Sequence, residues 1–597
     1  MSFVLPMTIL AGGAGLGLTL LAASEQAPAQ MRAQTYFDPI LSGALCSSGA
    51  DNRDRPLAYY QKVAAATETR PFVPPAAGNE AATADGDPPL YNNLGILSYR
   101  ITTKSPTAQR YFDQGLRLAY GFNHAEARNA FRAAQRHDPD CAMCAFGEAL
   151  VLGPNINAPM EADAVAPALA AVRKAKQNAA SASPREQALI AAITERYSDD
   201  PKAERPALDA AFAAAMGKAA ARFPKDDNIR VIYAESMMDL SPWDYWEAAG
   251  AKPKGRTQEI VDALETVLAR NPDHPGAIHY YIHMVEASST PERALPYTKR
   301  LALAMPGAGH LVHMPFHIYY RIGDYKAALK ANKQAVAIDE AYIARAKPTG
   351  AYPLAYYPHN VHSLMASAQM AGDGASAVAA AKKLARVVTA DAAQPIAAAQ
   401  FFAHAQFSPP TTVLALAAPA DGLPFVTAMW HYARGVAYAA QRNVAAARAE
   451  AAAIERLKAS DFSGLTVGGI SAPDVLELAR QVVLARIALA EGQLPAARAA
   501  FERALAMQDK LAYSEPPHWY YPVGQSLGAV LLRLGDLDAA ENAFRTSLAR
   551  APNNGWALYG LSEVYRRMGR ADAAAEVTRR LDEAWAGDRA TLDLNRL

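Results

Sequence analysis

The chain of 597 residues carries 59 basic and 58 acidic side chains, so its net charge is +1. Proteins that bind nucleic acid or anionic lipid concentrate positive charge, and this balance disfavours both kinds of partner. With 51% hydrophobic and 20% charged residues, the chain has the composition of a folded protein rather than a disordered one.

Residues 1–29 are expected to be an export signal. No Lys or Arg precedes Arg32, and the uncharged apolar stretch VLPMTILAGGAGLGLTLLAAS is followed by Ala27-Pro28-Ala29, a pattern typical of a cleavage site. The signal lacks basic residues at its start, so an uncleaved N-terminal membrane anchor remains the alternative. Export predicts a periplasmic or secreted protein.

Residues 30–105 are expected to be irregular, because the stretch RPFVPPAAGNEAATADGDPP is typical of a linker. From Ser105 onward the pattern becomes helical. The segments 111–123 and 124–139 are both amphipathic and are separated by a tight turn. They predict a helical hairpin.

Two short features follow this hairpin. Cys141 and Cys144 are either a local disulfide, which an exported protein would permit, or two small buried residues at the start of a helix. The loop 153–159 presents Asn155 and Asn157, which either cap the loop or contact a ligand in a groove.

The end of the chain shows the clearest repeat. Gly535 and Gly569 are 34 residues apart, and each follows one amphipathic segment and precedes another. Neither segment can bury its apolar face without a neighbouring repeat. Here the sequence resembles the tetratricopeptide repeat (TPR) family, at Leu527-Gly528, Gly535-Asp536, Ala540, Phe544 and Pro552.

The resemblance implies an all-α fold, an α-solenoid of TPR-like helical hairpins behind an irregular N-terminal segment. We expect a TPR-like solenoid over residues 106–385, an irregular helical connection over 386–474 and C-terminal TPR repeats over 475–597. The stretches 305–325 and 356–362 also resemble a group of exported bacterial TPR proteins, which implies fold and compartment only.

Seven of the 13 histidines lie between positions 279 and 362. His279 and His283 follow Pro272 by 7 and 11 residues, and His313 and His317 follow Pro306 by the same intervals. A spacing of four places each pair on one helical face, and stacked repeats bring such faces together. By resemblance to the family, these positions face the concave groove of the solenoid.

A third helix extends this pattern. The interval from Gly323 to Gly372 is 49 residues, which predicts an insertion of about 15 residues in a 34-residue repeat. After correction for that insertion, His359 and His362 take the positions of His310 and His313. Pro315 either kinks a helix or begins one, so His317 is a firmer candidate than His313.

Imidazole is a ligand for Zn, Cu and Fe, so the pattern predicts a transition-metal site. The candidate ligands are His279, His283, His310, His313, His317, His359, His362 and Glu286. Further candidate groove contacts are Glu235, Asp239, Tyr320, Asn155 and Asn157. The alternative is that the histidines are ordinary buried residues that hydrogen-bond the backbone between repeats.

Two functions therefore remain open. One is an exported solenoid whose metal supports binding, redox or hydrolytic chemistry on a small-molecule substrate. The other is a metal-free adaptor that binds a peptide or protein in its groove. The sequence contains no HExxH, Walker-type, GxGxxG or GxSxG motif, so it does not decide whether the protein is an enzyme.

Overall fold

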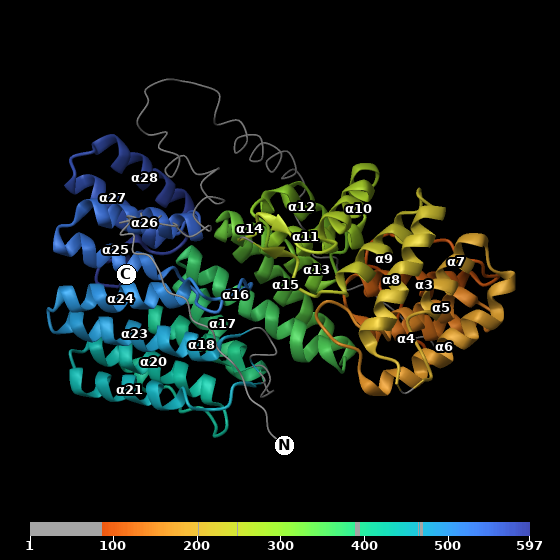
Figure 1. Cartoon of the computed structure of the whole chain (residues 1–597), viewed down its shortest axis with the longest axis horizontal. Coiled ribbons are helices and arrows are strands. Elements are labelled where there is room, and N and C mark those ends of the chain that lie inside the picture. The colour runs from red at the N-terminus through yellow and green to blue at the C-terminus, as the bar shows by residue number, and fades with distance from the viewer. Residues whose placement is uncertain are drawn as a thin grey trace, which may run out of the picture.

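The computed structural model describes residues 86–596, except residues 201, 248, 389–393, 464 and 466–469. The expected export signal and residues 30–85 lie outside the described residues. Residues 86–105 contain no helix or strand, and almost everything that follows is helical (Figure 1). Among the described residues, no helix has both the length and the apolar character needed to cross a bilayer.

The N-terminal part consists of paired antiparallel helices, and the predicted hairpin is its first pair. A side-chain cap begins each helix of that pair, because Ser105 accepts from the Ala108 amide and Asn123 accepts from the Glu126 amide. The helices are α3 (Pro106–Tyr120), α4 (His124–His137), α5 (Ala142–Val151), α6 (Val165–Asn178), α7 (Pro184–Thr194), α8 (Arg205–Arg222), α9 (Asp227–Met238) and α10 (Thr257–Arg270). Short elements are η2 (Ala162–Ala164), η3 (Ala179–Ser181) and the strand pair β1 (Trp246–Glu247) and β2 (Lys252–Pro253).

The central part carries the expected insertion. Gly323 and Gly372 both have positive φ and end helices, and the extra residues between them lengthen α15 to 22 residues and add a π-helical turn. The elements are α11 (Pro275–Glu286), η4 (Pro291–Ala294), α12 (Leu295–Ala304), α13 (Gly309–His313), α14 (Pro315–Ile322), α15 (Tyr325–Ala346), η5 (Tyr352–Tyr356), α16 (Tyr357–Ala371) and α17 (Gly374–Val387).

The C-terminal part continues the stack of hairpins. Within residues 386–474, the hairpin of α20 and α21 packs against α23, so this interval includes a regular layer of the solenoid. The helices are α18 (Gln394–Phe407), α19 (Pro410–Leu414), α20 (Pro424–Ala440), α21 (Val444–Leu457), α23 (Ala472–Ala490), α24 (Leu494–Gln508), α25 (Val523–Leu534), α26 (Leu537–Arg550), α27 (Gly555–Arg567) and α28 (Ala571–Ala584), with η7 (Arg589–Thr591) after them.

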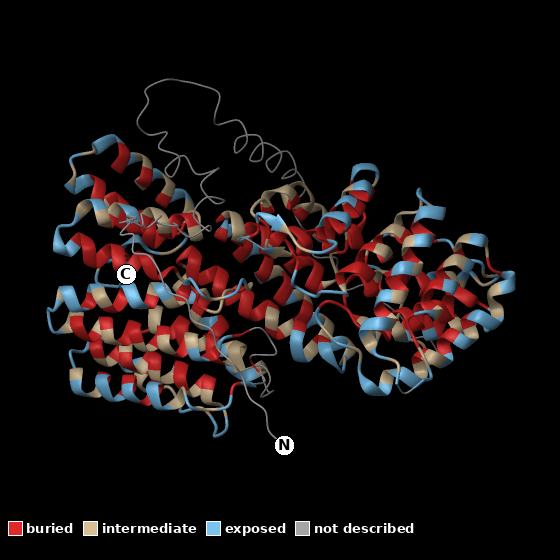
Figure 2. Ribbon diagram, viewed as in Figure 1, coloured by how far each residue is buried: buried red, intermediate tan, exposed pale blue. Residues whose placement is uncertain are grey.

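The described residues form two hydrophobic cores, which meet in the middle of the molecule. One core extends from Tyr91 to Tyr356 and the other from Phe316 to Leu592. The buried faces of the helices turn inward throughout (Figure 2). Because α13, α14 and the segment around α16 border both cores, polar residues at this seam are enclosed by apolar packing on either side.

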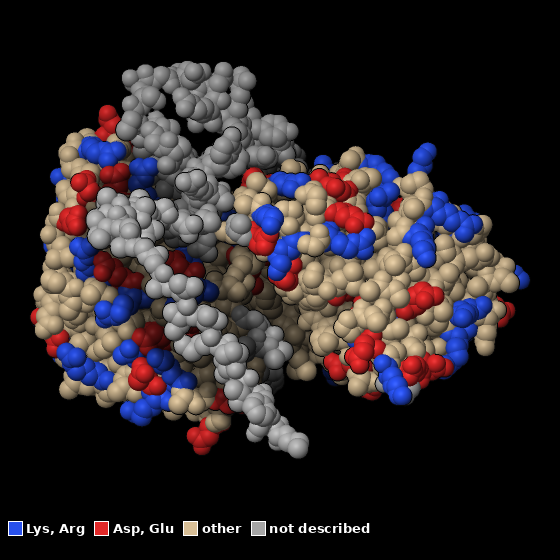
Figure 3. All heavy atoms as spheres, viewed as in Figure 1, with Lys and Arg blue, Asp and Glu red and all other residues tan. Residues whose placement is uncertain are grey.

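The outer surface agrees with the charge balance. On the described part of the face in Figure 3, basic and acidic side chains are interspersed rather than gathered by sign. Such a surface gives no long-range attraction for a polyanion.

The C-terminal end of the solenoid folds back onto the central helices. The amide of Ala586 donates to the carbonyl of Ala371 at 2.8 Å, and the Lys326 ammonium donates to the carbonyl of Glu583 at 2.6 Å. At Gly323 the approach is so close that a Cβ atom would clash with the backbone of Pro552. These contacts brace α14, α15 and α16, the helices that border the seam.

Gly323→Ala is expected to destabilise the protein by about 2–4 kcal/mol, because alanine brings both a strained positive φ and a clash with Pro552. Gly535→Ala is the matched control: its φ is +81° against +80° at Gly323, but open space surrounds it. The control should lose only about 1 kcal/mol. Chemical unfolding of both variants measures the difference, and equal losses would show that the close approach is unimportant.

Candidate functional site

Six of the seven predicted histidines meet at the seam between the two cores. They come from four helical segments between residues 275 and 371, which contact one another near the centre of the molecule in Figure 1. Five of the rings are at most 2% exposed, and His359 is partly exposed. The six are His279 and His283 on α11, His310 and His313 on α13, His317 on α14 and His359 on α16.

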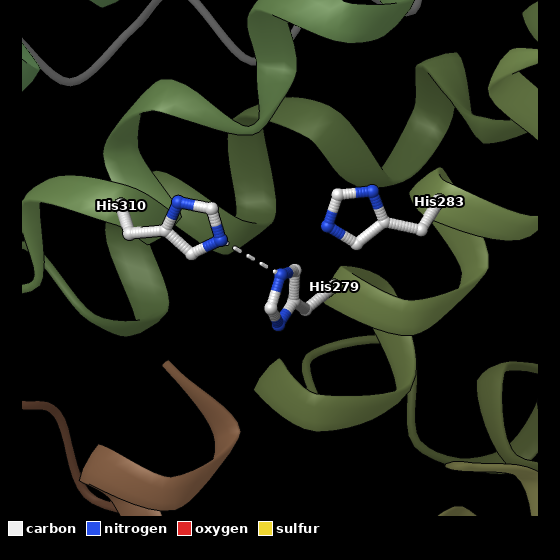
Figure 4. Close-up of side chains that lie close together, drawn as sticks. All are labelled: His279, His283 and His310. Carbon is white, nitrogen blue, oxygen red and sulfur yellow. Dashed lines mark hydrogen bonds between the residues drawn. The ribbon is translucent and has the colours of Figure 1, made fainter. Parts of the chain in front are cut away.

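His279, His283 and His310 form the first of two groups, which we call triad A. One ligand atom from each ring lies within 4.8 Å of the others. The Nε2 atoms of His279 and His310 are 3.2 Å apart, and the three rings turn toward a common space (Figure 4).

His313, His317 and His359 form the second group, triad B, again with one ligand atom each within 4.8 Å. Nε2 of His313 lies 3.0 Å from Nε2 of His317 and 3.1 Å from Nε2 of His359. The break at Pro315 does not separate His313 from His317. Helix α13 ends at His313 and α14 begins at Pro315, so only Met314 separates the two helices. The two rings meet across this short junction.

The outer nitrogens of two rings face obligate acceptors. Nδ1 of His279 lies 2.7 Å from the carbonyl oxygen of Tyr120, and Nδ1 of His313 lies 2.7 Å from the side-chain oxygen of Asn332. The amide group of Asn332 is itself oriented, since its nitrogen donates to Ser367 Oγ at 3.2 Å. An acceptor on Nδ1 places the proton there and leaves Nε2 as a lone pair.

Glu286 joins the two triads. Its Oε1 lies 2.9 Å from Nδ1 of His283 in triad A, and its Oε2 lies 2.6 Å from Nδ1 of His317 in triad B. The carboxylate is fully buried, and the Tyr513 hydroxyl also donates to it at 3.3 Å. Burial raises the pKa of Glu286, but the interactions with His317 and His283 outweigh burial and hold this pKa well below its usual range.

For four of the six imidazoles, burial favours the neutral form, which is the form that binds metals. Burial lowers the pKa of His279, His310 and His313 well below the ordinary value, and neighbouring histidines lower it further. His359 shifts in the same direction, mainly through burial. These rings are neutral near pH 7, so each retains a lone pair.

Two nitrogens of triad A, Nε2 of His283 and Nδ1 of His310, have no partner within the described structure. The Nδ1 side of His283 is committed to Glu286, and its Nε2 is buried without a hydrogen bond. An unpaired buried acceptor is costly unless something occupies the space that it faces. The direction of His283 Nε2 toward His279 and His310 indicates a ligand site.

Three of the separations between nitrogens, one in triad A and two in triad B, match those between two ligands of one ion, and the other pairs lie within 4.8 Å. Two nitrogens bound at about 2.0–2.1 Å, with bond angles of about 90–110°, lie about 2.8–3.4 Å apart. The contacts of 3.2 Å in triad A and 3.0 and 3.1 Å in triad B fall in that range.

The structure separates His362 from this cluster. Its Nε2 bonds the hydroxyl of Tyr520, which reaches it from the loop between α24 and α25. Burial lowers the pKa of His362 to about 3. The correction for the insertion predicted that His359 and His362 would both join the cluster, and the structure places only His359 there.

Glu235 and Asp239 belong to a different polar group. Asp239 pairs at 2.8 Å with Arg196, which is 1% exposed and also donates to the carbonyl oxygens of Leu150 and Pro154. Burial raises the pKa of Glu235 to about 7, an effect that Arg196 opposes. The two carboxylates therefore sit with a buried arginine rather than with the histidines.

Three other predicted contacts also lie outside the triads. Tyr320 is buried against Phe316 and Tyr325. Asn155 caps its own loop by accepting from the amides of Asn157 and Ala158. Burial raises the pKa of Tyr356 to about 12, an effect that hydrogen bonds from Asn157 and Asn155 oppose. The loop that carries these two asparagines therefore borders the ring of Tyr356, which itself packs against His310.

The cysteine pair forms a disulfide, with Cα atoms 5.4 Å apart. It lies at the start of α5, where Cys141 also accepts from the amide of Cys144. Of the two alternatives that the sequence left open for these cysteines, the structure shows the disulfide.

The expectation of an open groove was wrong for the histidines, which are enclosed by packing. An open cleft of about 960 Å³ lies elsewhere, along the exposed face of α15. Its lining includes Leu329, Ile338, Lys326, Lys330, Lys333 and Arg345, and none of the predicted ligands.

Sequence reasoning missed the residues that orient the rings. Tyr120 and Tyr513 reach the cluster from α3 and the loop after α24, far away in the sequence, and Asn332 reaches it from α15, 19 residues after His313. Trp243 was also missed: its ring packs edge-on at 5.1 Å from His283 while remaining 46% exposed. Its backbone φ of +65° was not foreseeable from a residue type that rarely adopts it.

Comparison with known proteins supports the repeat. Residues 531–590 match a tetratricopeptide repeat family model. No curated protein sequence shows a significant match.

Among solved structures, the chain is similar to the APC/C hetero-tetramer Cut9–Hcn1, with 12% identity, a TM-score of 0.28 and coverage of 83% of this chain and 77% of that one. It is also similar to the human IFIT1 dimer with m7Gppp-AAAA, with 12% identity, a TM-score of 0.29 and coverage of 81% and 91%. Similarities of this size support no argument about partners. Residues 531–590 are thus similar to the tetratricopeptide repeat family, and the described chain around them is a solenoid of helical hairpins.

Proposed function

We propose that this protein is an exported TPR solenoid that binds a transition metal through the histidines at its central seam. The observation that carries the proposal is the convergence of six imidazoles, four of which have Nδ1 within 3 Å of a carbonyl, amide or carboxylate oxygen. Orientation of a histidine ligand by a carbonyl or carboxylate on its second nitrogen is typical of protein metal sites.

The donor set favours particular metals. Neutral imidazole suits Cu, Zn, Fe and Ni, whereas Mg and Ca prefer oxygen ligands. Three protein ligands leave a further coordination position for water or a substrate, as in many catalytic metal sites. A metal bound in this way can activate water or undergo redox chemistry, and the partial exposure of His359 gives the site an approach from solvent.

Protonation of a histidine is the alternative explanation of the short contacts between the imidazole nitrogens. If His317 carried a proton on both nitrogens, it would donate to Glu286 and to His313 and would satisfy triad B without a metal. That arrangement leaves Nε2 of His283 unpaired in triad A. Metal binding accounts for both triads together.

The proposal predicts near-stoichiometric metal in the purified full chain, produced without a histidine tag and equilibrated with Cu²⁺ or Zn²⁺. His283→Ala combined with His317→Ala should lose most of it, since one ligand is removed from each triad. His404→Ala is a matched control, because His404 is 3% exposed and bonds Ser408 far from the cluster. Elemental analysis after dialysis gives the result, and a wild type free of metal would refute the proposal.

The cleft on α15 favours a second role as an adaptor. It combines apolar side chains with several basic ones, a mixture suited to an acidic peptide. A peptide partner that binds the wild type but not Lys330→Glu, with metal content unchanged, would assign this role. Loss of metal without loss of the partner would show that the two surfaces act independently.

A further inference from the structure

We infer that the six histidines form two three-histidine sites that hold a pair of transition-metal ions, one in triad A and one in triad B, joined by Glu286. This inference rests on the proposed function, because it specifies how many ions the seam binds and how they are coupled. The division of ligands, the placement of Glu286 and the position of the shortest nitrogen contacts carry it.

The ligands divide into two sets that share no member. Triad A draws on α11 and the start of α13, and triad B on the end of α13, α14 and α16. Each closest nitrogen contact, at 3.0–3.2 Å, lies within one triad rather than between them. A single ion cannot accept six such ligands when the close contacts separate in this way.

The triads are nevertheless neighbours. The rings of His283 and His317 are 5.5 Å apart between centroids, and those of His310 and His313 are 5.8 Å apart. Ring contacts of this length place the two sites side by side at the seam. Two ions here would interact electrostatically and would lie within the same apolar surroundings.

Glu286 couples the two sites. One oxygen of its carboxylate faces a ligand of triad A and the other faces a ligand of triad B. A metal bound to His283 or His317 withdraws electron density from that ring and so strengthens its hydrogen bond to Glu286. This changes the carboxylate as an acceptor for the other ring. The single negative charge also offsets part of the charge that two cations bring into a buried site.

Copper is the ion that this donor set favours most. Each site offers three neutral nitrogens and no thiolate, and copper heads the affinity order of the divalent first-row metals for nitrogen ligands. Zinc should bind at the same two places with lower affinity. The full chain therefore should take up two equivalents of either ion.

Counting ions in variants of the untagged full chain tests the inference. The wild type should bind two equivalents of Cu²⁺ or Zn²⁺ in equilibrium dialysis. His279→Gln with His310→Gln should leave one equivalent, His313→Gln with His359→Gln should leave one, and all four substitutions together should leave none. His362→Gln is the control and should retain two, because His362 is buried nearby but bonds Tyr520.

The outcomes distinguish failure of the two-ion inference from failure of the metal-binding proposal. A wild type that binds one equivalent, lost in either pair of variants, would overturn the pair of ions and leave the metal-binding proposal intact. A wild type that binds none would overturn both. Two equivalents lost together in either folded variant would also refute separate sites.

A spectroscopic test needs no substitution and so does not depend on how variants fold. Electron paramagnetic resonance of the wild type with one and then two equivalents of Cu²⁺ should show a simple signal that broadens or weakens per copper as the second ion binds. A second equivalent that merely doubles the first signal would place the ions far apart and contradict the inference.

Discussion

Glu286→Gln is expected to lower the affinity of the seam for metal by about 10- to 100-fold, the usual effect of removing a group that orients histidine ligands. The carboxylate offers an acceptor to both His283 and His317. Glutamine offers one acceptor and one donor, so one of the two rings loses its partner and is free to turn. Titration of the full chain with Cu²⁺ in the presence of a competing chelator measures the change.

A second buried glutamate provides the control. Glu148 is held by Arg128, Arg132 and Gln135 at the N-terminal end of the solenoid. Glu148→Gln should weaken folding without altering metal affinity. An affinity in Glu286→Gln equal to that of Glu148→Gln would show that the carboxylate does not orient the ligands.

Arg196→Met is expected to reduce the free energy of unfolding by about 3–5 kcal/mol, the loss typical of breaking a buried ion pair on one side. Asp239 would remain in an environment where its side chain is 2% exposed, without its cation. The carbonyl oxygens of Leu150 and Pro154 would lose a donor as well. Chemical denaturation measures the effect.

Arg205→Met serves as the comparison for this loss. Its guanidinium also pairs with a carboxylate, Asp209, but its side chain is 28% exposed. Such a pair contributes about 1 kcal/mol or less. Adding Asp239→Asn to Arg196→Met should recover part of the stability, because the uncompensated charge is removed. Equal losses in Arg196→Met and Arg205→Met would contradict the account.

Local patterns in the sequence predicted the helices and the turns. Glycines at fixed intervals and apolar periodicity are properties of short segments, and the hairpins that they predict are present at both ends of the described chain. The insertion after Gly323 was also visible as an interval of 49 residues. How those residues divide between a longer α15 and a π-helical turn depends on packing that no short segment contains.

The cluster was predictable to the extent that it follows the repeat. His279, His283, His313 and His317 occupy equivalent positions in successive units, so stacking alone brings them together. His362 lies outside the cluster because its ring bonds the hydroxyl of Tyr520, a partner 158 residues further along the chain that the repeat pattern does not indicate. Glu286 was foreseen as a ligand, and its placement between two triads depends on the angle between α11 and α14.

The groups that orient the rings could not be predicted from the sequence. Asn332 contacts His313 from α15, the second helix of the same hairpin, and Tyr120 contacts His279 through a backbone carbonyl at the end of α3. Neither residue carries a pattern that distinguishes it from its neighbours. Enclosure of the cluster follows from the return of the C-terminal repeats to the centre, which is a property of the whole solenoid.

Anomalous diffraction from a crystal of the full chain, purified without a histidine tag and equilibrated with copper, tests the central claim most directly. The account predicts two peaks at the copper absorption edge at the seam, one bounded by Nε2 of His279 and His283 and the other by Nε2 of His313 and His317. An electron density map without an anomalous peak at either place, in a crystal whose solution contained saturating copper, would contradict it.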